Sequence, residues 1–485
     1  MKKIFFVFVI SVMILNAQSF SVHQFQKEYY TNLKSEESIV QNFQTKISGV
    51  KKLNKVVFGY LPDWEYSTGA GNYLRYDLIT HLAVFSFQAD ASGNLKDPAG
   101  WPWNDVINSA SANNVKLIAS VTNFNGDEIH KIFTDVSVRN SFFNNIKTKF
   151  QIGGFSGVNI DFENVLDADK STVIVNFFSE LKKFFSNINT PCEISFASPV
   201  VNFSGWNFNG ISQSCDYLFV MCYDFYGSWS TTTGPSAPLE GGYFNIKKSF
   251  ANYYSSVSSQ KLILGVPYYG NYWKTKTGDA YTIVDTTKSK KEFVKSLRYK
   301  EIFPSYQSKE ILWDALSKTR WLRWQDATWN QIWYDDSSSI AIKYDYAIQN
   351  KLLGVGIWAL GYDNGSQDFW KLIERKFTGT VDVESEMLKL PSSFELYQNY
   401  PNPFNPSTVI NYKILKAGRV ALRIFDLFGR EIKTLVDKFQ QPGVYHIEFN
   451  VENISNTNWN NSSGVYFYSL FTEQSVQTKK MLLIK

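Results

Sequence analysis

From about residue 53 to residue 378 the chain alternates short, β-branched apolar runs with longer stretches of helical period. The eight apolar runs span residues 55–61, 79–87, 115–121, 157–163, 193–199, 216–223, 261–267 and 354–360. Strands that alternate with helices along a chain build βα units around a parallel sheet. Eight such units predict an α/β fold, a (β/α)8 TIM barrel, with its functional site at the carboxyl ends of the strands.

Two departures from this alternation predict further structure. The gap before the last apolar run is about twice as long as any other and includes residues 274–314, so we expect an inserted lobe between strands seven and eight. After residue 378 the pattern changes to alternating strand runs separated by Gly and Asn. We therefore expect a linker over 379–393 and a C-terminal all-β sandwich domain over 394–485.

The first residues have the pattern of a secretory signal peptide over 1–17. Lys2 and Lys3 precede an apolar run over 4–15, and the small residue Ala17 follows. The run is too short to span a bilayer, and no other stretch is long and apolar enough, so the mature protein is expected to have no membrane span. Residues 18–52 are polar and of mixed charge, which suits a short helix or an extended leader without visible chemistry.

Composition narrows the classes of partner. The 44% hydrophobic and 17% aromatic content suits large cores, and surplus aromatic rings serve as platforms for sugars, although ordinary core packing explains them equally well. A net charge of +5 without a basic block argues against nucleic acid. Three cysteines (Cys192, Cys215 and Cys222) allow no disulfide framework, and the four histidines show no ligand spacing, so we expect no metal and no cofactor.

The fourth apolar run, 157–163, contains the strongest chemical signal. In a strand successive side chains alternate faces, so Asn159, Asp161 and Glu163 share one side and the apolar residues face the other. Burial beside a second carboxylate raises the pKa of a carboxylic acid, because ionising both places two like charges close together. Glu163 is then expected to stay protonated and to donate a proton, as cleavage of a glycosidic bond requires. The alternative is an exposed strand, where such spacing is common.

Two other strands end in polar or aromatic residues. The sixth run ends in Met221, Cys222, Tyr223 and Asp224, and the eighth contains Trp358. Tyr223 is placed to donate a hydrogen bond at the mouth of a barrel, and Trp358 is placed to form a flat floor for a sugar ring. Core packing is the alternative for each of them.

Together these motifs resemble glycoside hydrolase family 18, the chitinases and related endo-N-acetylglucosaminidases, over nearly all of 53–378. Residues 156–163 match in part the fourth-strand signature D-G-x-D-x-D-x-E of that family. Met221, Tyr223 and Asp224 match its sixth-strand M-x-Y-D, and Trp358 matches its eighth-strand aromatic residue. Two further aromatic positions resemble its pocket wall, Tyr60 and Phe87.

The resemblance implies a retaining, substrate-assisted mechanism. Glu163 would protonate the leaving oxygen, and Asp161 and Tyr223 would orient the substrate's own 2-acetamido group for attack on the anomeric carbon. The resemblance places the reacting sugar against Trp358, Asp224 and Met221. Ser156 and Asn159 replace acidic residues of the fuller signature. Asn159 can hydrogen-bond Asp161 without sharing a proton with it, so an altered pH profile is expected.

The expected substrate is chitin or a related polymer of β-1,4-linked N-acetylglucosamine. Peptidoglycan and glycoprotein N-glycans are the alternatives within the same mechanism, and a catalytically silent glycan-binding lectin is the alternative outside it. Residues 396–485 resemble the C-terminal sorting domains of the type IX secretion route, with a carbohydrate-binding sandwich as the alternative. This second resemblance implies the type IX machinery as a partner and a secreted or cell-surface location after export through the outer membrane.

Overall fold

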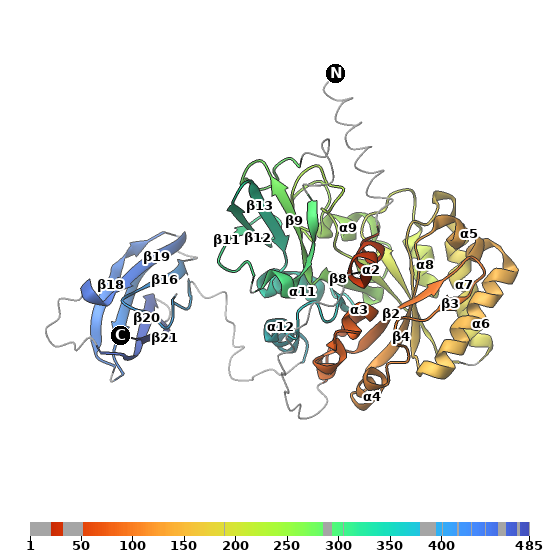
Figure 1. Ribbon diagram of the computed structural model, residues 1–485, viewed down its shortest axis with the longest axis horizontal. Helices are drawn as coiled ribbons and strands as arrows, with labels where there is room; N and C mark the ends of the chain where they lie inside the picture. The colour runs from red at the N-terminus through yellow and green to blue at the C-terminus, as the bar shows by residue number, and fades with distance from the viewer. Residues whose placement is uncertain are drawn as a thin grey trace, which may run out of the picture. The chain divides into compact units, whose positions relative to one another are not determined.

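The computed structural model describes residues 21–32, 52–188, 190–284, 293–303, 305–378, 394–399, 401–414, 417–427, 429–441, 443–453, 462–472 and 476–484. The chain has two compact units, Met1–Thr380 and Val381–Lys485 (Figure 1). The predicted signal peptide over 1–17 and the predicted linker over 379–393 lie outside the described residues, as does most of the predicted leader over 18–52.

The first unit is a closed parallel barrel, as predicted. Its sheet order is β1-β14-β8-β7-β6-β5-β4-β2, and pairing between β1 and β2 closes it. Each of the eight apolar runs forms one strand: β1 (Val56–Pro62), β2 (His81–Ala89), β4 (Lys116–Asn123), β5 (Gly157–Phe162), β6 (Glu193–Pro199), β7 (Tyr217–Met221), β8 (Leu262–Pro267) and β14 (Gly354–Trp358). A short strand, β3 (Leu95–Lys96), pairs antiparallel with the end of β2.

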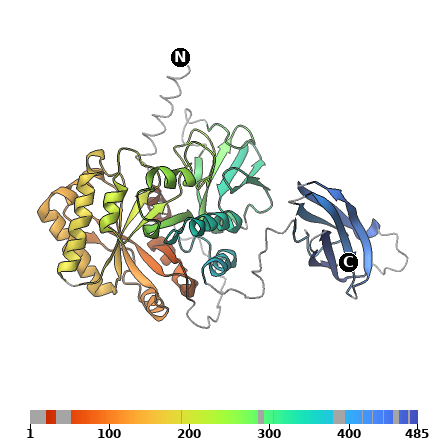
Figure 2. The ribbon, with the colours of Figure 1, turned by 180° about the vertical axis from the view of Figure 1, so that it is seen from behind.

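Helices cover the outside of these strands in both views of the ribbon (Figures 1 and 2). Side-chain caps define where several of them begin, as where Asn125 caps α5 and Asp135 caps α6. Gly154 ends α6 in the left-handed conformation that favours glycine, and the chain then enters β5. The outer helices are α4 (Asn104–Ala112), α5 (Gly126–Thr134), α6 (Val136–Gly153), α7 (Thr172–Asn187), α8 (Phe208–Ser214), α9 (Ile246–Tyr253), α11 (Ser337–Gln349) and α12 (Gln367–Phe377).

The predicted lobe between strands seven and eight is present. It is an antiparallel sheet of order β10-β9-β13-β12-β11 that runs from Tyr269 to Tyr334, so it begins earlier and ends later than the expected 274–314. Trp273, Trp321 and Trp333 pack in its interior, with the last two rings stacked at 5.0 Å. Its elements are β9 (Tyr269–Thr275), β10 (Phe293–Arg298), α10 (Tyr299–Ile302), β11 (Glu310–Asp314), β12 (Thr319–Gln325) and β13 (Trp329–Tyr334).

Two short helices lie near the carboxyl ends of the barrel strands. Helix α3 (Asp63–Tyr66) follows β1 directly. Helix α2 (Val22–Asn32) belongs to the leader and contacts α3, although thirty residues separate the two helices in the sequence (Figure 1). Of the two alternatives for the leader, a short helix is present over these residues. Short 3-10 turns are η1 (Ala70–Asn72), η2 (Tyr76–Leu78), η3 (Asp167–Asp169) and η4 (Ser259–Lys261).

The second unit is all-β, as predicted. Two antiparallel sheets, β15-β16-β19 and β18-β17-β20-β21, enclose one hydrophobic core to which both contribute, for example Ile410 and Tyr412 from the first and Leu422 and Tyr468 from the second. The elements are β15 (Phe394–Leu396), β16 (Ser407–Ile414), β17 (Gly418–Phe425), β18 (Glu431–Gln440), β19 (Gly443–Asn450), η5 (Val451–Asn453), β20 (Gly464–Thr472) and β21 (Val476–Leu483).

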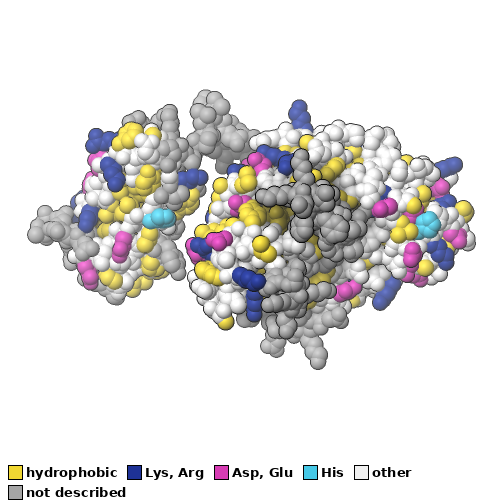
Figure 3. Space-filling view, turned by 90° about the horizontal axis from the view of Figure 1, so that it is seen from above, with side chains coloured by type: hydrophobic (Ala, Val, Ile, Leu, Met, Phe, Trp, Pro, Cys, Tyr) yellow, Lys and Arg dark blue, Asp and Glu magenta, His cyan; other side chains and the backbone are white. Residues whose placement is uncertain are grey.

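Three further observations bear on the expected partners and thiols. The three cysteines are free, and Cys215 and Cys222 are buried. Among the described helices, none has the length and apolar character needed to cross a membrane. On the face shown in Figure 3, basic and acidic side chains are interspersed over the described surface instead of gathering by sign.

Candidate active site

Strand β5 carries the predicted carboxylates to the carboxyl end of the barrel. Asn159 and Asp161 are fully buried on its inner face, and Glu163 follows the last residue of the strand with 13% of its side chain exposed. The ligand oxygens of Asp161 and Glu163 lie within 4.8 Å of each other. The two carboxyl groups thus share one small, largely dehydrated site.

Burial raises the pKa values of two carboxylic acids in this site, Glu163 and Asp224. It raises the pKa of Glu163 from 4.5 to about 8, with His23 opposing the change and Asp161 adding to it. Burial also raises the pKa of Asp224 to about 7, although Tyr269 and Ser236 donate hydrogen bonds to its carboxylate. Glu163 therefore holds a proton at neutral pH, as the two-residue spacing predicted.

Asn159 differs from the expectation that it hydrogen-bonds Asp161. Its Oδ1 accepts a hydrogen bond of 2.8 Å from Tyr60 on β1, and its Nδ2 donates one of 2.9 Å to Ser195 on β6. The amide thus ties three strands together inside the barrel. Tyr60, predicted in the pocket wall, lies beneath the site, with its ring centroid 5.5 Å from that of Trp358.

The residues of the sixth and eighth strands converge on the same place. Trp358 ends β14 and is fully buried, and Tyr223 lies two residues beyond β7. Met221, Tyr223 and Asp224 line a cavity of about 170 Å³ together with Glu163. The structure therefore brings together the acid, the tyrosine and the M-x-Y-D residues that the sequence placed on different strands.

Phe87 is not part of the pocket wall, and this expectation was wrong. Its ring packs against Trp101 and Phe155, 5.3 and 5.6 Å away, toward the outer helices. Phe85 takes the inner position, 4.8 Å from Trp358. The cause is an irregularity in the pairing of β2 with β4 between Phe85 and Phe87, since a β-bulge moves the alternation of faces by one residue.

The leader helix α2 enters this site, which the sequence did not indicate. His23 Nδ1 donates a hydrogen bond of 2.8 Å to Asp161 Oδ2, and its Nε2 lies 2.9 Å from Tyr223 Oη. Its ring lies over Trp358 with the centroids 3.7 Å apart. Burial lowers the pKa of His23, but the adjoining Asp161 carboxylate outweighs burial and leaves that pKa raised.

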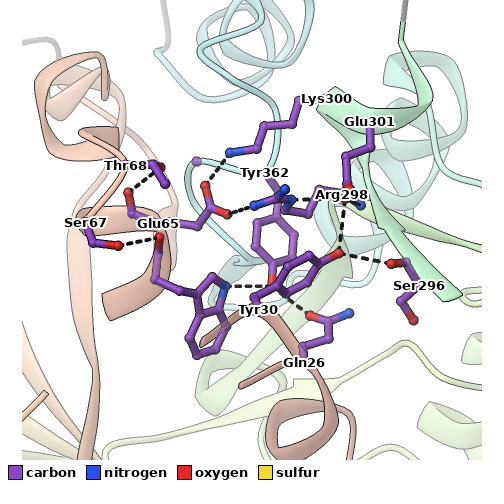
Figure 4. A network of polar contacts seen from close by, with 12 residues as sticks. Gln26, Tyr30, Glu65, Ser67, Thr68, Ser296, Arg298, Lys300, Glu301 and Tyr362 are labelled. Atoms are coloured by element: carbon purple, nitrogen blue, oxygen red, sulfur yellow. Dashed lines mark hydrogen bonds and ion pairs between the residues drawn. The ribbon is translucent and has the colours of Figure 1, made fainter. Parts of the chain in front are cut away.

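Other residues of the leader also bind the site. Ser21 Oγ donates a hydrogen bond of 2.8 Å to Glu163 Oε1. Gln26 Oε1 accepts hydrogen bonds from Trp358 Nε1 at 2.8 Å and from Tyr362 Oη at 2.9 Å. Figure 4 shows Gln26 and Tyr30 pointing toward a polar network beside the site.

That network joins the barrel to the lobe. Glu65, fully buried on α3, pairs with Arg298 at 2.9 Å and with Lys300 at 2.6 Å (Figure 4). The Tyr30 hydroxyl donates to Ser296 O and Glu301, and the Arg298 guanidinium lies 4.4 Å from the centre of the Tyr30 ring. The leader helix therefore contacts both parts of the first unit.

His23, Asp161 and Glu163 also form a group with the ligand types of a metal site. Both imidazole nitrogens of His23 already take part in hydrogen bonds, one with Asp161 and one with Tyr223. As it stands, the group is a hydrogen-bonded network that joins the leader to the acids. The sequence offered no signal for it, because His23 is 138 residues away from Asp161.

Comparison with known proteins agrees with this geometry. The sequence profile of glycosyl hydrolases family 18 matches residues 56–363, and that of the secretion system C-terminal sorting domain matches residues 398–485. The cortical fragment-lytic enzyme of Bacillus anthracis is 23% identical over 322 residues, which cover 62% of this chain and 69% of that protein.

Two solved structures share the fold of the first unit. A chitinase of Cycas revoluta, solved with (GlcNAc)3, has a TM-score of 0.59 at 20% identity and covers 66% of this chain and 99% of its own. A spore cortex-lytic enzyme of Bacillus megaterium has a TM-score of 0.54 at 21% identity, covering 68% and 75%. The second unit is a C-terminal sorting domain of the type IX route, which directs export. With its profile matched over most of the barrel, the chain belongs to the glycosyl hydrolases of family 18.

Proposed function

We propose that the barrel hydrolyses polymers of β-1,4-linked N-acetylglucosamine, chitin first, by a retaining, substrate-assisted mechanism. The observation that carries the proposal is the seat of the His23 imidazole. A flat group with a hydrogen-bond donor lies on Trp358, where it donates to Asp161 and meets the hydroxyl of Tyr223. An acetamido group needs the same partners, because its N–H donates and its carbonyl oxygen accepts.

The protonated state of Glu163 supports the proposed mechanism. Protonated Glu163 gives its proton to the glycosidic oxygen as the bond from that oxygen to the anomeric carbon breaks. The acetamido oxygen bonds to the anomeric carbon, and Asp161 stabilises the resulting oxazolinium ion. Glu163, now ionised, takes a proton from water. The water oxygen bonds to the anomeric carbon as the bond from that carbon to the acetamido oxygen breaks, which restores the acetamido group and gives net retention. The close approach of the two carboxyl groups places Asp161 within reach of the acetamido group while Glu163 protonates the leaving oxygen.

Peptidoglycan is the second candidate substrate. It is supported by the similarity to the cortical fragment-lytic enzyme and by Asn159, which stands where the fuller chitinase signature has an acid. Endo-cleavage of N-glycans would use the same acid and the same acetamido group. All three polymers carry the acetamido group that the proposed mechanism uses.

The test compares products. Purified full-length protein, together with a variant carrying His23→Ala and Gln26→Ala, is incubated with chitin oligosaccharides, peptidoglycan and an N-glycoprotein, and NMR follows the anomeric configuration of the first products. Short N-acetylglucosamine oligomers released as β-anomers support the proposal. Products from peptidoglycan alone or from glycoprotein alone would assign that polymer as the substrate in place of chitin. Products released as α-anomers would contradict the retaining mechanism. If the wild-type protein and the variant both bind the glycans and neither releases products, the result favours a lectin.

We also propose that export ends with the enzyme outside the outer membrane, either released or attached to the cell surface. The support is the sorting domain over 398–485. Fractionation of a producing strain tests this: enzyme in the medium or on intact cells agrees with the proposal, and enzyme retained inside the cells contradicts it.

A further inference from the structure

Helix α2 presents one face to the cleft. His23, Gln26 and Tyr30 lie at positions i, i+3 and i+7, so they project from the same side of the helix, and all three are buried. Thr31 and Glu28 are exposed. The buried face is polar and aromatic, which is unusual for a helix that only contributes to a core.

We propose that residues 21–32 are a built-in inhibitor that occupies the sugar subsite of the enzyme in place of substrate. This rests on the proposed function for the identity of the excluded ligand. Each polar group that the reaction requires is engaged by the leader: Glu163 by Ser21, and Asp161 and Tyr223 by His23. Substrate cannot reach these three groups while the helix is docked, because the side chains of the helix fill the subsite and exclude the sugar sterically.

The contacts imitate those of a substrate. Ser21 Oγ lies 2.8 Å from Glu163 Oε1 and so occupies space next to the carboxyl group that would protonate the glycosidic oxygen. His23 lies on Trp358 as a sugar ring would, with centroids 3.7 Å apart. Gln26 accepts the indole N–H of Trp358, so it fixes the ring on which His23 rests.

The flanking contacts hold the helix in the cleft. Lys27 Nζ donates a hydrogen bond of 3.0 Å to Ser86, and it lies 5.9 Å from the centre of the Phe85 ring. Tyr30 binds the lobe through Ser296 and Glu301. The leader thus spans from the wall at β2 to the inserted lobe.

Docking is nevertheless incomplete, which favours release. Within the described part of the chain, Gln26 Nε2 and Asp161 Oδ1 are buried without a hydrogen-bond partner. A buried polar atom without a partner costs free energy that a better-matched ligand recovers. Substrate that satisfies Asp161 fully is therefore expected to compete with the helix.

Open space adjoins the helix. A hollow of about 790 Å³ is lined by Gln24 and Lys27 on one side and by the ends of β2 and β4 on the other. A smaller cavity next to Glu163 lies over β5, β6 and β7. An oligosaccharide can therefore contact the enzyme in the larger hollow before it displaces the leader.

The inhibitor has a kinetic signature. Substrate binds only the undocked form, so the apparent KM rises by the reciprocal of the undocked fraction, and kcat at saturation is unchanged. Variants that weaken docking should lower KM and leave kcat as it was. A helix with a purely structural role would lower kcat or stability on mutation instead.

The experiment uses the full chain in three forms: wild type, the His23→Ala/Gln26→Ala variant, and Thr31→Ala as a control on the exposed face. Activity is measured on chitin oligosaccharide, or on peptidoglycan if the enzyme cleaves only peptidoglycan. The KM of the double variant should be lower than that of wild type by about tenfold or more, and kcat should be equal. Thr31→Ala should match wild type. An unchanged or raised KM in the double variant overturns the proposal.

A second measurement does not need turnover. Amide hydrogen exchange over residues 21–32 is compared with and without saturating (GlcNAc)4. Exchange should be slow in wild type and in Thr31→Ala, fast in the double variant, and accelerated in wild type by the sugar. Sugar binding that leaves the exchange of wild type unchanged overturns the inhibitor. Absence of turnover in all three forms would reject the proposed function, while the exchange result still decides the inhibitor.

Discussion

Tyr60 on β1 donates a hydrogen bond of 2.8 Å to Asn159 on β5, across the interior of the barrel. Because Ser195 accepts from the other end of the same amide, Asn159 is directed away from Asp161. In this chain the position where the family signature has an acid is therefore a neutral strut between strands. The acid-base chemistry of the site therefore rests on Asp161 and Glu163.

Asn159→Asp should move the pH profile of kcat/KM to higher pH. A second carboxylate next to Glu163 disfavours ionisation of Glu163, so the alkaline limb, which Glu163 sets at about pH 8 in wild type, should move to higher pH. The measurement is the rate as a function of pH across that limb. Ser195→Ala removes a contact of the same amide without adding charge and should leave the alkaline limb in place; an alkaline limb that does not move in Asn159→Asp would contradict the prediction.

Glu163→Gln should reduce kcat by a factor of about 10²–10⁴ and spare sugar binding, because the amide cannot donate a proton to the leaving oxygen. Unaltered hydrolysis would remove Glu163 from its assigned role. In wild type, activity should fall as pH rises through about 8, where Glu163 ionises.

The same variant should be more stable than wild type at neutral to mildly alkaline pH. The pKa of Glu163 is about 8 in the folded chain and 4.5 in the unfolded chain. Stability due to this group is therefore complete below pH 4.5 and is lost as pH rises toward 8, by about 1.4 kcal/mol for each pH step of one between these two values. Glutamine removes that loss. Thermal unfolding at pH 4.5 and 8 should show a gain only at the higher pH.

Glu193→Gln is the matched control. Burial raises the pKa of Glu193, but hydrogen bonds from His81 and Lys116 outweigh burial and hold it at about 2. Stability from this group is present above pH 4.5 and lost as pH falls toward 2, so its amide variant should be less stable at neutral pH. A gain in both variants would show that the effect does not come from the pKa values.

Loss of the cations should destabilise the barrel more than loss of Glu65. Glu65 is fully buried, whereas Arg298 and Lys300 keep 18% and 19% of their side chains exposed. Arg298→Met with Lys300→Met leaves a buried carboxylate unpaired, which costs about 3–5 kcal/mol. Glu65→Gln leaves cations that can reach water and should cost less.

Tryptophan fluorescence is a suitable probe for this comparison. Trp459 alone of the 14 tryptophans lies after residue 380, so the signal comes almost entirely from the first unit. Urea midpoints for the two variants would contradict the prediction if their order were reversed.

Phe85→Leu should lower kcat/KM on oligosaccharides by about tenfold, and Phe87→Leu should change only stability. Phe85 packs against Trp358 and Trp64 in the site, and a smaller side chain loosens the platform. Phe87 packs against Trp101 and Phe155, away from the acids. Equal loss of kcat/KM in both variants would contradict the assignment of faces.

The sequence by itself determined the barrel, the lobe and the shared face of Asp161 and Glu163. Each is a local property: strand and helix periods repeat over a few residues, and a spacing of two places side chains on one side of a strand. The location of Tyr223 and Trp358 at the same site was also predictable, because the carboxyl ends of the parallel strands of a barrel lie together on one face.

Only the tertiary structure decided how distant parts meet. A single bulge in β2 turns Phe87 to the outer face and leaves Phe85 at the site. The irregularity in strand pairing shifts which side chains face inward, and the hydrophobic pattern of the sequence does not show it. Asn159 turned to Tyr60 and Ser195 because closure of the barrel brought both within reach. His23 reached Asp161 across 138 residues, since the fit of a helix into a cleft depends on the assembled surface, for which the sequence has no period.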